Sequence, residues 1–518
     1  MTDNNRLNPQ ESAKAVYDRL EGDRESYVTR AEECAKFTIP SLFPKEFDNG
    51  NTKYDTPYQS VGARGVNNLA SKLLLALFPP NASFFRLDVR EDVLKFLEAN
   101  QATKREIEQK LVQQEQIILK YIESNQIRVT LHESLKQLIV AGNCLLFLPP
   151  KEGGIKMYRL NDYVVERDAM GNVIQMVAKD KLTYATLPEG LRGIVKEPQE
   201  VNEEVTVYTH IYYNADDQRY YSYQEIDETV LPGYEQNYPV NACPWIPLRL
   251  VKVDGESYGR SYVEEYLGDL KTLENLQKAI TELASIAATV INLVNPNGIT
   301  QVRKVANCKN GGFVPGRVED ITTLQLQKAQ DMQIAKATAD ALEARLSYIF
   351  MLNSAVQRQG ERVTAEEIRY VAGELEDTLG GIYSILSQEL QLPLVRRIMA
   401  QLQATGQLAD LPDNIVTPAI TTGVEALGRG HDLNKLTTLL SIIGQNPEAS
   451  SYIDWSGAVI AIASSLGIDA TGIIKTPEQI QQEQQQAAML QMATAATPNI
   501  TKGVMDSMNS NQGGMTSE

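Results

Sequence analysis

The feature that most constrains the fold is an apolar stripe over residues 263–294. Its members recur at steps of three or four residues, as on one face of an α-helix. They are Val263, Leu267, Leu270, Leu273, Leu276, Ile280, Leu283, Ala287, Val290 and Val294. The spacing predicts a single helix of 32 residues, roughly 48 Å long at 1.5 Å per residue. The segment Asn295-Pro296-Asn297-Gly298 is expected to end it.

A helix of this length must bury its apolar side. Residues 332–350 predict a second helix with apolar residues on one side, but it is too short to cover the first alone. We therefore expect neighbouring copies of the chain to cover the rest. A head-to-tail contact between copies gives a ring when it closes.

A polar loop over residues 352–363 follows the second helix and carries Arg358 and Arg362. Thr364 and Glu367 form a capping box, which predicts the start of a third long helix. Gly380-Gly381 are expected to bend this helix. Pro393 is expected to remove the hydrogen bond to the Glu389 carbonyl.

The N-terminal half, residues 1–260, is predicted to be an α+β domain. Its helices are expected at 10–36, 60–78, 104–123 and 130–141, and its strands at 143–148, 162–166, 173–178, 205–213 and 246–253. Residues 299–330 predict a small β and loop module, and residues 432–470 a small helical unit. The Gln-rich tail from Thr476 ends in about twenty residues predicted to be disordered.

Charge and composition favour a soluble intracellular chain. The 518 residues carry a net charge of −17, whereas tight nucleic-acid binders are usually basic. The four cysteines are far apart and form no CxxC motif, so reduced thiols are expected. The N-terminus has no apolar signal region, and no apolar run reaches the ~18–20 residues that span a membrane.

Catalytic and metal-binding motifs are weak. No GxxxxGK[ST] loop occurs, which disfavours an ATP-driven motor. The three histidines, His132, His210 and His431, are isolated, so we expect no metal site. Ser257 in Gly-Glu-Ser-Tyr-Gly fits the nucleophile-elbow pattern, but the βαβα alternation of a hydrolase is missing. We expect no catalytic residue and no cofactor, and interpret the two glycines as a sharp turn from sheet into helix.

Two groups of basic residues are candidate contacts. Arg358 and Arg362 belong to an ordinary solvated loop in a single chain, but in a ring they would form a circle of guanidinium groups suited to a polyanion. The 299–330 module has a local basic bias. Its cations are Arg303, Lys304, Lys309 and Arg317, which form either a surface for an acidic partner or nucleic acid, or plain solvated surface.

Long stretches of the chain resemble the head-to-tail connector, or portal, family of short-tailed bacteriophages of the podovirus and autographivirus type. They are YVTRAEECAKFTIPSLFP (27–44), VGARGVNNLASKLLLALFP (61–79), DGESYGRSYVEEYLGDLKTLENLQ (254–277) and MLNSAVQRQGERVTAEEIRYVAGELEDTLGGIYSILSQELQLPLV (351–395). The resemblance implies a mainly helical α+β subunit of a twelve-membered ring at one capsid vertex. The Gln-rich tail departs from it.

The resemblance also implies a division into regions. They are a wing (1–262 and the long kinked helix 365–404), stem helices (263–294 and 332–351), a clip (295–331), a channel loop (352–364), a crown (405–475) and a tail (476–518). The implied partners are other copies, terminase, tail adaptor and nozzle proteins, major capsid and scaffolding proteins, and internal core proteins. Double-stranded DNA would pass through the ring without sequence preference, and no membrane is involved.

The resulting expectation is a virion protein, assembled in the host cytoplasm, that conducts DNA during packaging and ejection. We hypothesise that Arg358 and Arg362 touch phosphates and that their loop acts as a one-way gate. Solvated charge pairs contribute only ~0–1 kcal/mol each, so DNA can slide past them. The alternatives are a serine hydrolase using Ser257 and a helical scaffold that binds only protein.

Overall fold

The computed structural model describes residues 11–45, 48–80, 83–89, 101–150, 153–184, 187, 204–288, 291–324, 329–352, 373–375, 378–408 and 416–421. The chain divides into two compact units, residues 1–426 and 427–518. The predicted helical unit at 432–470 and the tail belong to the second unit, which lies outside the described residues, as does the capping box at Thr364. Among the described residues, no helix is both long and apolar enough to span a membrane.

Four helices of the N-terminal half confirm the predicted ones: α1 (Ala13–Lys36), α2 (Val61–Leu77), α4 (Gln101–Ser124) and α5 (Ile127–Ala141). Helix α2 packs against α5 and ends where Pro79-Pro80 cannot continue it. Helix α5 ends at Gly142, whose φ of 75° is left-handed and whose N–H donates to the Leu138 carbonyl. A Cβ there would lie 2.6 Å from the Arg260 carbonyl carbon, so only glycine fits this close approach.

The main sheet is antiparallel, with strand order β4-β5-β6-β7-β8 and β9 paired with β7. Its strands are β4 (Tyr163–Arg167), β5 (Val173–Thr183), β6 (Glu204–Asn214), β7 (Arg219–Ile226), β8 (Thr229–Val230) and β9 (Gln236–Pro239). A second sheet has the order β10-β2-β3, formed by β10 (Trp245–Arg249), β2 (Asn143–Phe147) and β3 (Lys156–Tyr158). All five predicted strands are confirmed, although β10 ends at Arg249 rather than at residue 253. The observed mixture of helices and antiparallel sheets is the predicted α+β class.

Segments distant in sequence share the main core. Strand β1 (Phe85–Val89) pairs antiparallel with β13 (Val416–Ile420), more than 300 residues later. Helix α2 contacts α10 (Ala329–Ile349) so closely that a Cβ on Gly65 would lie 2.4 Å from Phe350 Cγ. Phe350 and the α2 residues Leu69 and Leu73 are buried in the same cluster. The N-terminal helices therefore support the end of α10.

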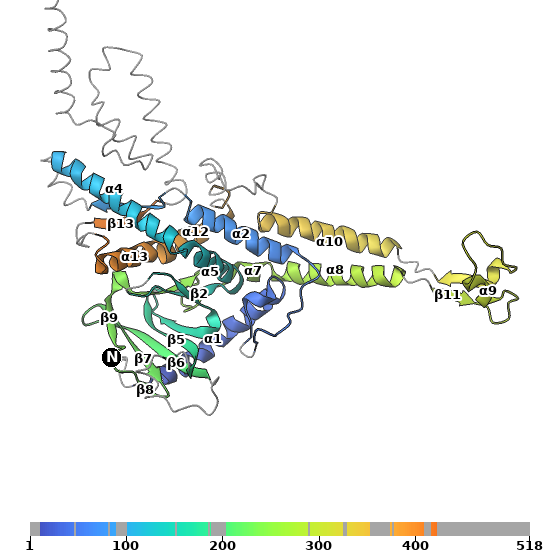
Figure 1. The fold of residues 1–518 in the computed structure, drawn as a ribbon, viewed down its shortest axis with the longest axis horizontal. Coiled ribbons are helices and arrows are strands. Elements are labelled where there is room, and N and C mark those ends of the chain that lie inside the picture. Colours follow the sequence, from blue (N-terminus) through green and yellow to red (C-terminus); the bar gives the residue numbers. More distant parts are fainter. Residues whose placement is uncertain are drawn as a thin grey trace, which may run out of the picture. The chain divides into compact units, whose positions relative to one another are not determined.

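The predicted long helix at 263–294 is only partly correct. A short helix, α7 (Tyr262–Glu265), precedes α8 (Leu267–Ala288), which packs beside α10 (Figure 1). Residues 291–294 form strand β11, paired with β12 (Ile321–Leu324), so the prediction of a helix to residue 294 is wrong at its end. The β-branched run Thr289-Val290-Ile291 favours a strand over a helix, because such side chains fit a pleated surface. The 22 residues of α8 extend about 33 Å.

The predicted bend of the third long helix is confirmed in its described part. Gly380 has a φ of 24° and precedes a new helix, α12 (Gly381–Leu386). Residues Ser387–Gln391 form a π-helix, η6, and Pro393 lies in the first turn of α13 (Leu392–Ala404). The π-helix was not predicted. It places the irregular backbone immediately before the proline that cannot donate a hydrogen bond.

Candidate functional site

Arg358 and Arg362 lie outside the described residues, but both ends of their segment are anchored on α2. Lys72 Nζ donates to the Met351 carbonyl oxygen at 3.0 Å and to Glu374 Oε2 at 3.2 Å. Asn68 Nδ2 donates to the carbonyl oxygens of Phe350 and Met351, each at 3.0 Å. One buried ammonium group thus binds residues on both sides of 353–372. Met351 and Glu374, which lie on either side of the undescribed residues, therefore share one contact on α2.

The helix pair α8–α10 has a buried base and an exposed far half. Leu270 and Leu273, near the start of α8, are buried in the core. Arg345 of α10 forms an ion pair with Asp269 of α8. Farther along, Ile286 is 56% exposed and Ile334 is 68% exposed.

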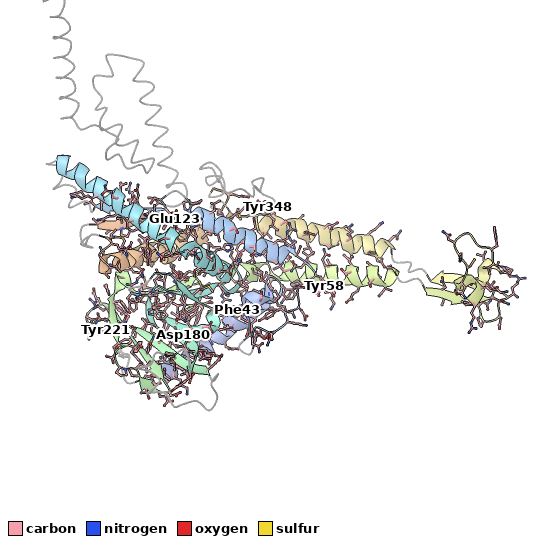
Figure 2. All side chains as sticks on the ribbon, in the orientation of Figure 1. Phe43, Tyr58, Glu123, Asp180, Tyr221 and Tyr348 are labelled. Carbon is pink, nitrogen blue, oxygen red and sulfur yellow. The ribbon has the colours of Figure 1, made fainter. Side chains whose placement is uncertain are left out.

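Tyr348, labelled in Figure 2, is 77% exposed at the opposite, core end of α10 and so extends the exposed apolar side chains along the helix. Several exposed apolar side chains on one helix pair are typical of an interaction site. The exposed half of α8–α10 is therefore a candidate contact surface, in agreement with the predicted need for a neighbouring copy.

The 291–324 module consists of β11 (Ile291–Val294), α9 (Val302–Ala306), a 3-10 turn (Val318–Asp320) and β12. All four predicted basic residues of the surface, Arg303, Lys304, Lys309 and Arg317, are exposed. The module carries four basic and two acidic side chains, a net charge of +2 in a chain of −17. No ion pair within 4.0 Å joins these four cations to a carboxylate of the described residues. The four cations are therefore exposed, and their role as a partner surface stays a prediction.

One of the two acids is used inside the module. Asp320 is buried and accepts from the Thr300 N–H at 3.0 Å and from Thr300 Oγ1 at 2.7 Å. These hydrogen bonds from Thr300 lower the pKa of the Asp320 carboxyl. Gly298 allows the approach, because a Cβ there would lie 2.5 Å from Asp320 Cγ. The carboxylate thus joins the segment around Thr300 to the 3-10 turn.

Exposed apolar side chains are the part of this surface that the sequence analysis missed. Phe313 is fully exposed, at 101% of its reference area, Val318 is 93% exposed and Ile299 is 70% exposed. The available signal was Gly311-Gly312-Phe313-Val314-Pro315-Gly316, in which apolar residues stand between turn residues that place them on a loop.

Ser257 does not lie in a catalytic arrangement among the described residues. Its Oγ accepts from the Arg167 backbone N–H at 3.3 Å, and its carbonyl oxygen accepts from Arg167 Nε at 3.1 Å. His210 instead contacts Tyr223 and Gln175, and His132 contacts Ser71. The third histidine, His431, lies outside the described residues. The Gly-Glu-Ser-Tyr-Gly motif is a turn, with Gly255 at a φ of 80°.

A cavity of about 490 Å³ lies beside α1 and is lined by charged side chains, with Asp180 (Figure 2) among them. Its charges are largely matched internally. Tyr158 Oη donates to Asp180 Oδ2 at 2.9 Å, and Lys156 pairs with the other oxygen. Burial raises the pKa of the Asp162 carboxyl. No group of three or more His, Cys, Asp or Glu side chains suited to a metal ion occurs in the described part of the chain.

Comparisons with known proteins agree on one family. A family model described as "Bacteriophage head to tail connecting protein" matches residues 10–474. The chain is 55% identical to the portal protein of Enterobacteria phage T3 over 492 residues, which cover 93% of this chain and 91% of that protein. It is 54% identical to the portal protein of Escherichia phage T7 over 489 residues, with the same coverage.

Similarity to solved structures is weaker. A chain of a native gene transfer agent virion shares 13% identity and a TM-score of 0.36, covering 79% of this chain and 89% of that chain.

Proposed function

The chain belongs to the family of bacteriophage head-to-tail connecting proteins, and we propose that twelve copies form a ring at one vertex of a phage capsid. Its relatives are named as portal proteins, a structural component of the phage and not an enzyme. Double-stranded DNA enters the capsid through this ring during packaging and leaves through it at ejection. The ring is assembled in the host cytoplasm and becomes part of the virion.

The proposed regions follow the sequence analysis, with one correction. The wing comprises residues 1–262 and 365–404, and the crown residues 405–475, although β13 (Val416–Ile420) of the latter segment pairs with β1 of the wing. The stem helices become α8 and α10, because β11 belongs with the 291–324 module, the proposed clip. The segment 352–364 is the proposed channel loop. The clip binds terminase and then the tail adaptor and nozzle proteins, while capsid, scaffolding and internal core proteins bind elsewhere on the ring.

The observation that carries the ring proposal is the helix pair α8–α10. Its base is fixed in the core by Leu270 and Leu273, and its far half exposes Ile286 and Ile334. Burying such side chains against a neighbouring copy is favourable by about 25 cal/mol per Å² of apolar surface. A contact between different faces of successive copies closes into a ring.

Electron microscopy of the purified full-length protein tests the ring. We expect rings with a central hole for the natural chain and for Met170→Ser, which changes an exposed apolar side chain on a turn away from α8 and α10. The double variant Ile286→Ser, Ile334→Ser should yield mostly unassembled subunits. A natural chain that stays monomeric at high concentration, or closes without a hole, contradicts the proposal.

The anchoring by Lys72 and Asn68 supports the proposal that Arg358 and Arg362 contact DNA in the channel, since both ends of their segment are fixed on α2. Two guanidinium groups per copy offer weak phosphate contacts that do not hold the duplex.

The variant Arg358→Ala, Arg362→Ala should assemble normally but package or retain less DNA per particle, as measured by nuclease-protected genome length. Lys53→Ala, at an exposed site, is the control. Particles of the double variant that fill and keep a complete genome would refute this role.

A further inference from the structure

The exposed apolar side chains of the 291–324 module alternate along the chain with its cations, and we treat residues 299–318 as one candidate surface. We name it the Phe313 surface. Its members are Ile299, Val302, Arg303, Lys304, Lys309, Phe313, Arg317 and Val318, all exposed. A single exposed apolar residue is ordinary. Several within 34 residues, with Phe313 fully in solvent, are typical of an interaction site.

Hydrogen bonds bring the apolar and basic members together. The Arg317 N–H donates to Thr300 Oγ1 at 2.8 Å, which joins the stretch that contains Ile299 to the stretch that contains Val318. The Gly312 N–H donates to the Lys309 carbonyl at 2.9 Å, which closes a turn and places Phe313 just after it. Gly311 in this turn has a φ of 84°, a conformation that glycine adopts without strain.

The surface combines open positive charge with an aromatic side chain. The buried Asp320 carboxylate accepts its hydrogen bonds from Thr300 inside the module. Glu319 is therefore the exposed acid of the module, beside four exposed cations. Aromatic residues and arginine are enriched at the centres of protein interfaces, where an aromatic anchor fills a pocket on the partner.

We propose that the Phe313 surface binds a protein partner that offers an apolar pocket for Phe313, ringed by Asp and Glu carboxylates. This inference rests on the proposed function and specifies the chemistry of the partner that docks on the clip. The four cations complement carboxylates. The phosphates of duplex DNA would pair with the cations, but a duplex has no apolar pocket for Phe313 and Val318. Stacking of bases on aromatic side chains occurs with single strands.

The test measures binding of assembled full-length rings to the purified tail adaptor protein of the same phage, immobilised on a sensor. Phe313→Ser should weaken binding by roughly 10- to 100-fold, mainly through faster dissociation. Lys304→Gln with Arg317→Gln should slow association and flatten its dependence on NaCl between about 50 and about 300 mM. Met170→Ser and Lys53→Gln, exposed sites outside the module, should bind like the natural chain.

Three results would overturn the inference. In the first, Phe313→Ser rings bind the adaptor with unchanged affinity. In the second, Phe313→Ser abolishes the rings seen by electron microscopy, which makes the surface a contact between copies. In the third, the charge variants lose binding to a short DNA duplex while Phe313→Ser has no effect on the adaptor. Absence of rings from the natural chain instead refutes the proposed function.

Discussion

At the scale of single residues, Glu225 on β7 supplies the cap that α1 lacks locally. The side chain of the N-cap residue, Ser12, makes no capping hydrogen bond of its own. Instead the buried Glu225 carboxylate accepts from Ser12 Oγ at 2.6 Å and from the Ala13 and Lys14 N–H groups at 2.8 and 3.2 Å. A carboxylate at a helix N-terminus is favourable because it satisfies free N–H groups and the helix dipole.

We expect Glu225→Ala to lower the free energy of unfolding by about 2 kcal/mol, because buried donors lose their acceptor. Urea denaturation monitored by circular dichroism measures the change. Glu228→Ala is the matched control. Glu228 is exposed and forms a surface ion pair with Lys14 at 3.9 Å, and such a pair contributes at most about 1 kcal/mol. Equal losses in the two variants would show that the cap contributes nothing.

The buried His210 side chain should make the free energy of unfolding depend on pH. Burial, with Arg19 nearby, lowers its pKa from 6.5 to about 4. The unfolded chain therefore binds more protons than the folded one between these values, and stability present above pH 6.5 is lost as the pH falls towards 4. The shift corresponds to at most about 3 kcal/mol. In urea denaturation, the free energy of unfolding of His210→Gln should fall less between pH 7 and pH 4.5 than that of the natural chain. Identical losses would contradict this.

Lys72 has a testable structural role. Lys72→Met should lower the free energy of unfolding by about 2 kcal/mol, because the buried Met351 carbonyl and Glu374 lose their partner. Combining it with Glu374→Gln should cost less than the sum of the two single changes, since both remove one interaction. Lys53→Met, at an exposed site, should stay within about 0.5 kcal/mol. Strict additivity in a double-mutant cycle would contradict the anchoring.

At the scale of elements, the contact between α2 and α10 depends on a glycine. Gly65→Ala should destabilise the chain by about 1–3 kcal/mol, because its Cβ would lie 2.4 Å from Phe350 Cγ in a filled core. Gly22→Ala in α1 is the control, since no atom lies within 4 Å of its Cβ, and it should stabilise by about 0.5–1 kcal/mol. Thermal unfolding compares them, and a gain for Gly65→Ala would contradict the close packing.

The elements that the sequence predicted well are those with a strong local signal. Amphipathic periodicity identified α1, α2, α4 and α5. The strands β7, β8 and β9 were missed, because tyrosine and polar residues give them no clear alternation and their stability comes from pairing. Residues 291–294 continued the helical spacing yet pair with β12, a partner about thirty residues away that no local pattern reveals.

The candidate site also contains residues that the sequence revealed and residues that only the fold revealed. The four cations of the 291–324 module were found from charge alone, and they are exposed as expected. Phe313 was missed because an apolar residue in a sequence is normally assigned to a core, and only the fold shows it in solvent. The anchoring of both segment ends by Lys72 joins residues about 280 and 300 positions away. Such a contact depends on tertiary packing and cannot be read from spacing.

At the scale of the whole molecule, charge is distributed unevenly. The chain has a net charge of −17, while the 291–324 module alone is +2. Copies that assemble therefore bring like net charges together, and the net charge of the proposed ring repels DNA from its walls, apart from the contacts proposed for Arg358 and Arg362. The cohesion of such a ring must come from apolar contacts of the kind that α8 and α10 expose, opposed by repulsion between like charges.

This balance predicts how salt acts on assembly. The screening length falls from about 14 Å near 0.05 M salt to about 4 Å near 0.5 M, while apolar contacts keep their strength. The assembled fraction of the natural chain, measured by sedimentation velocity, should therefore rise with NaCl over this range. The Ile286→Ser, Ile334→Ser variant should stay unassembled throughout, because screening removes repulsion without replacing buried area. A fraction that falls with salt would mean that ion pairs between copies, rather than apolar contacts, hold the ring.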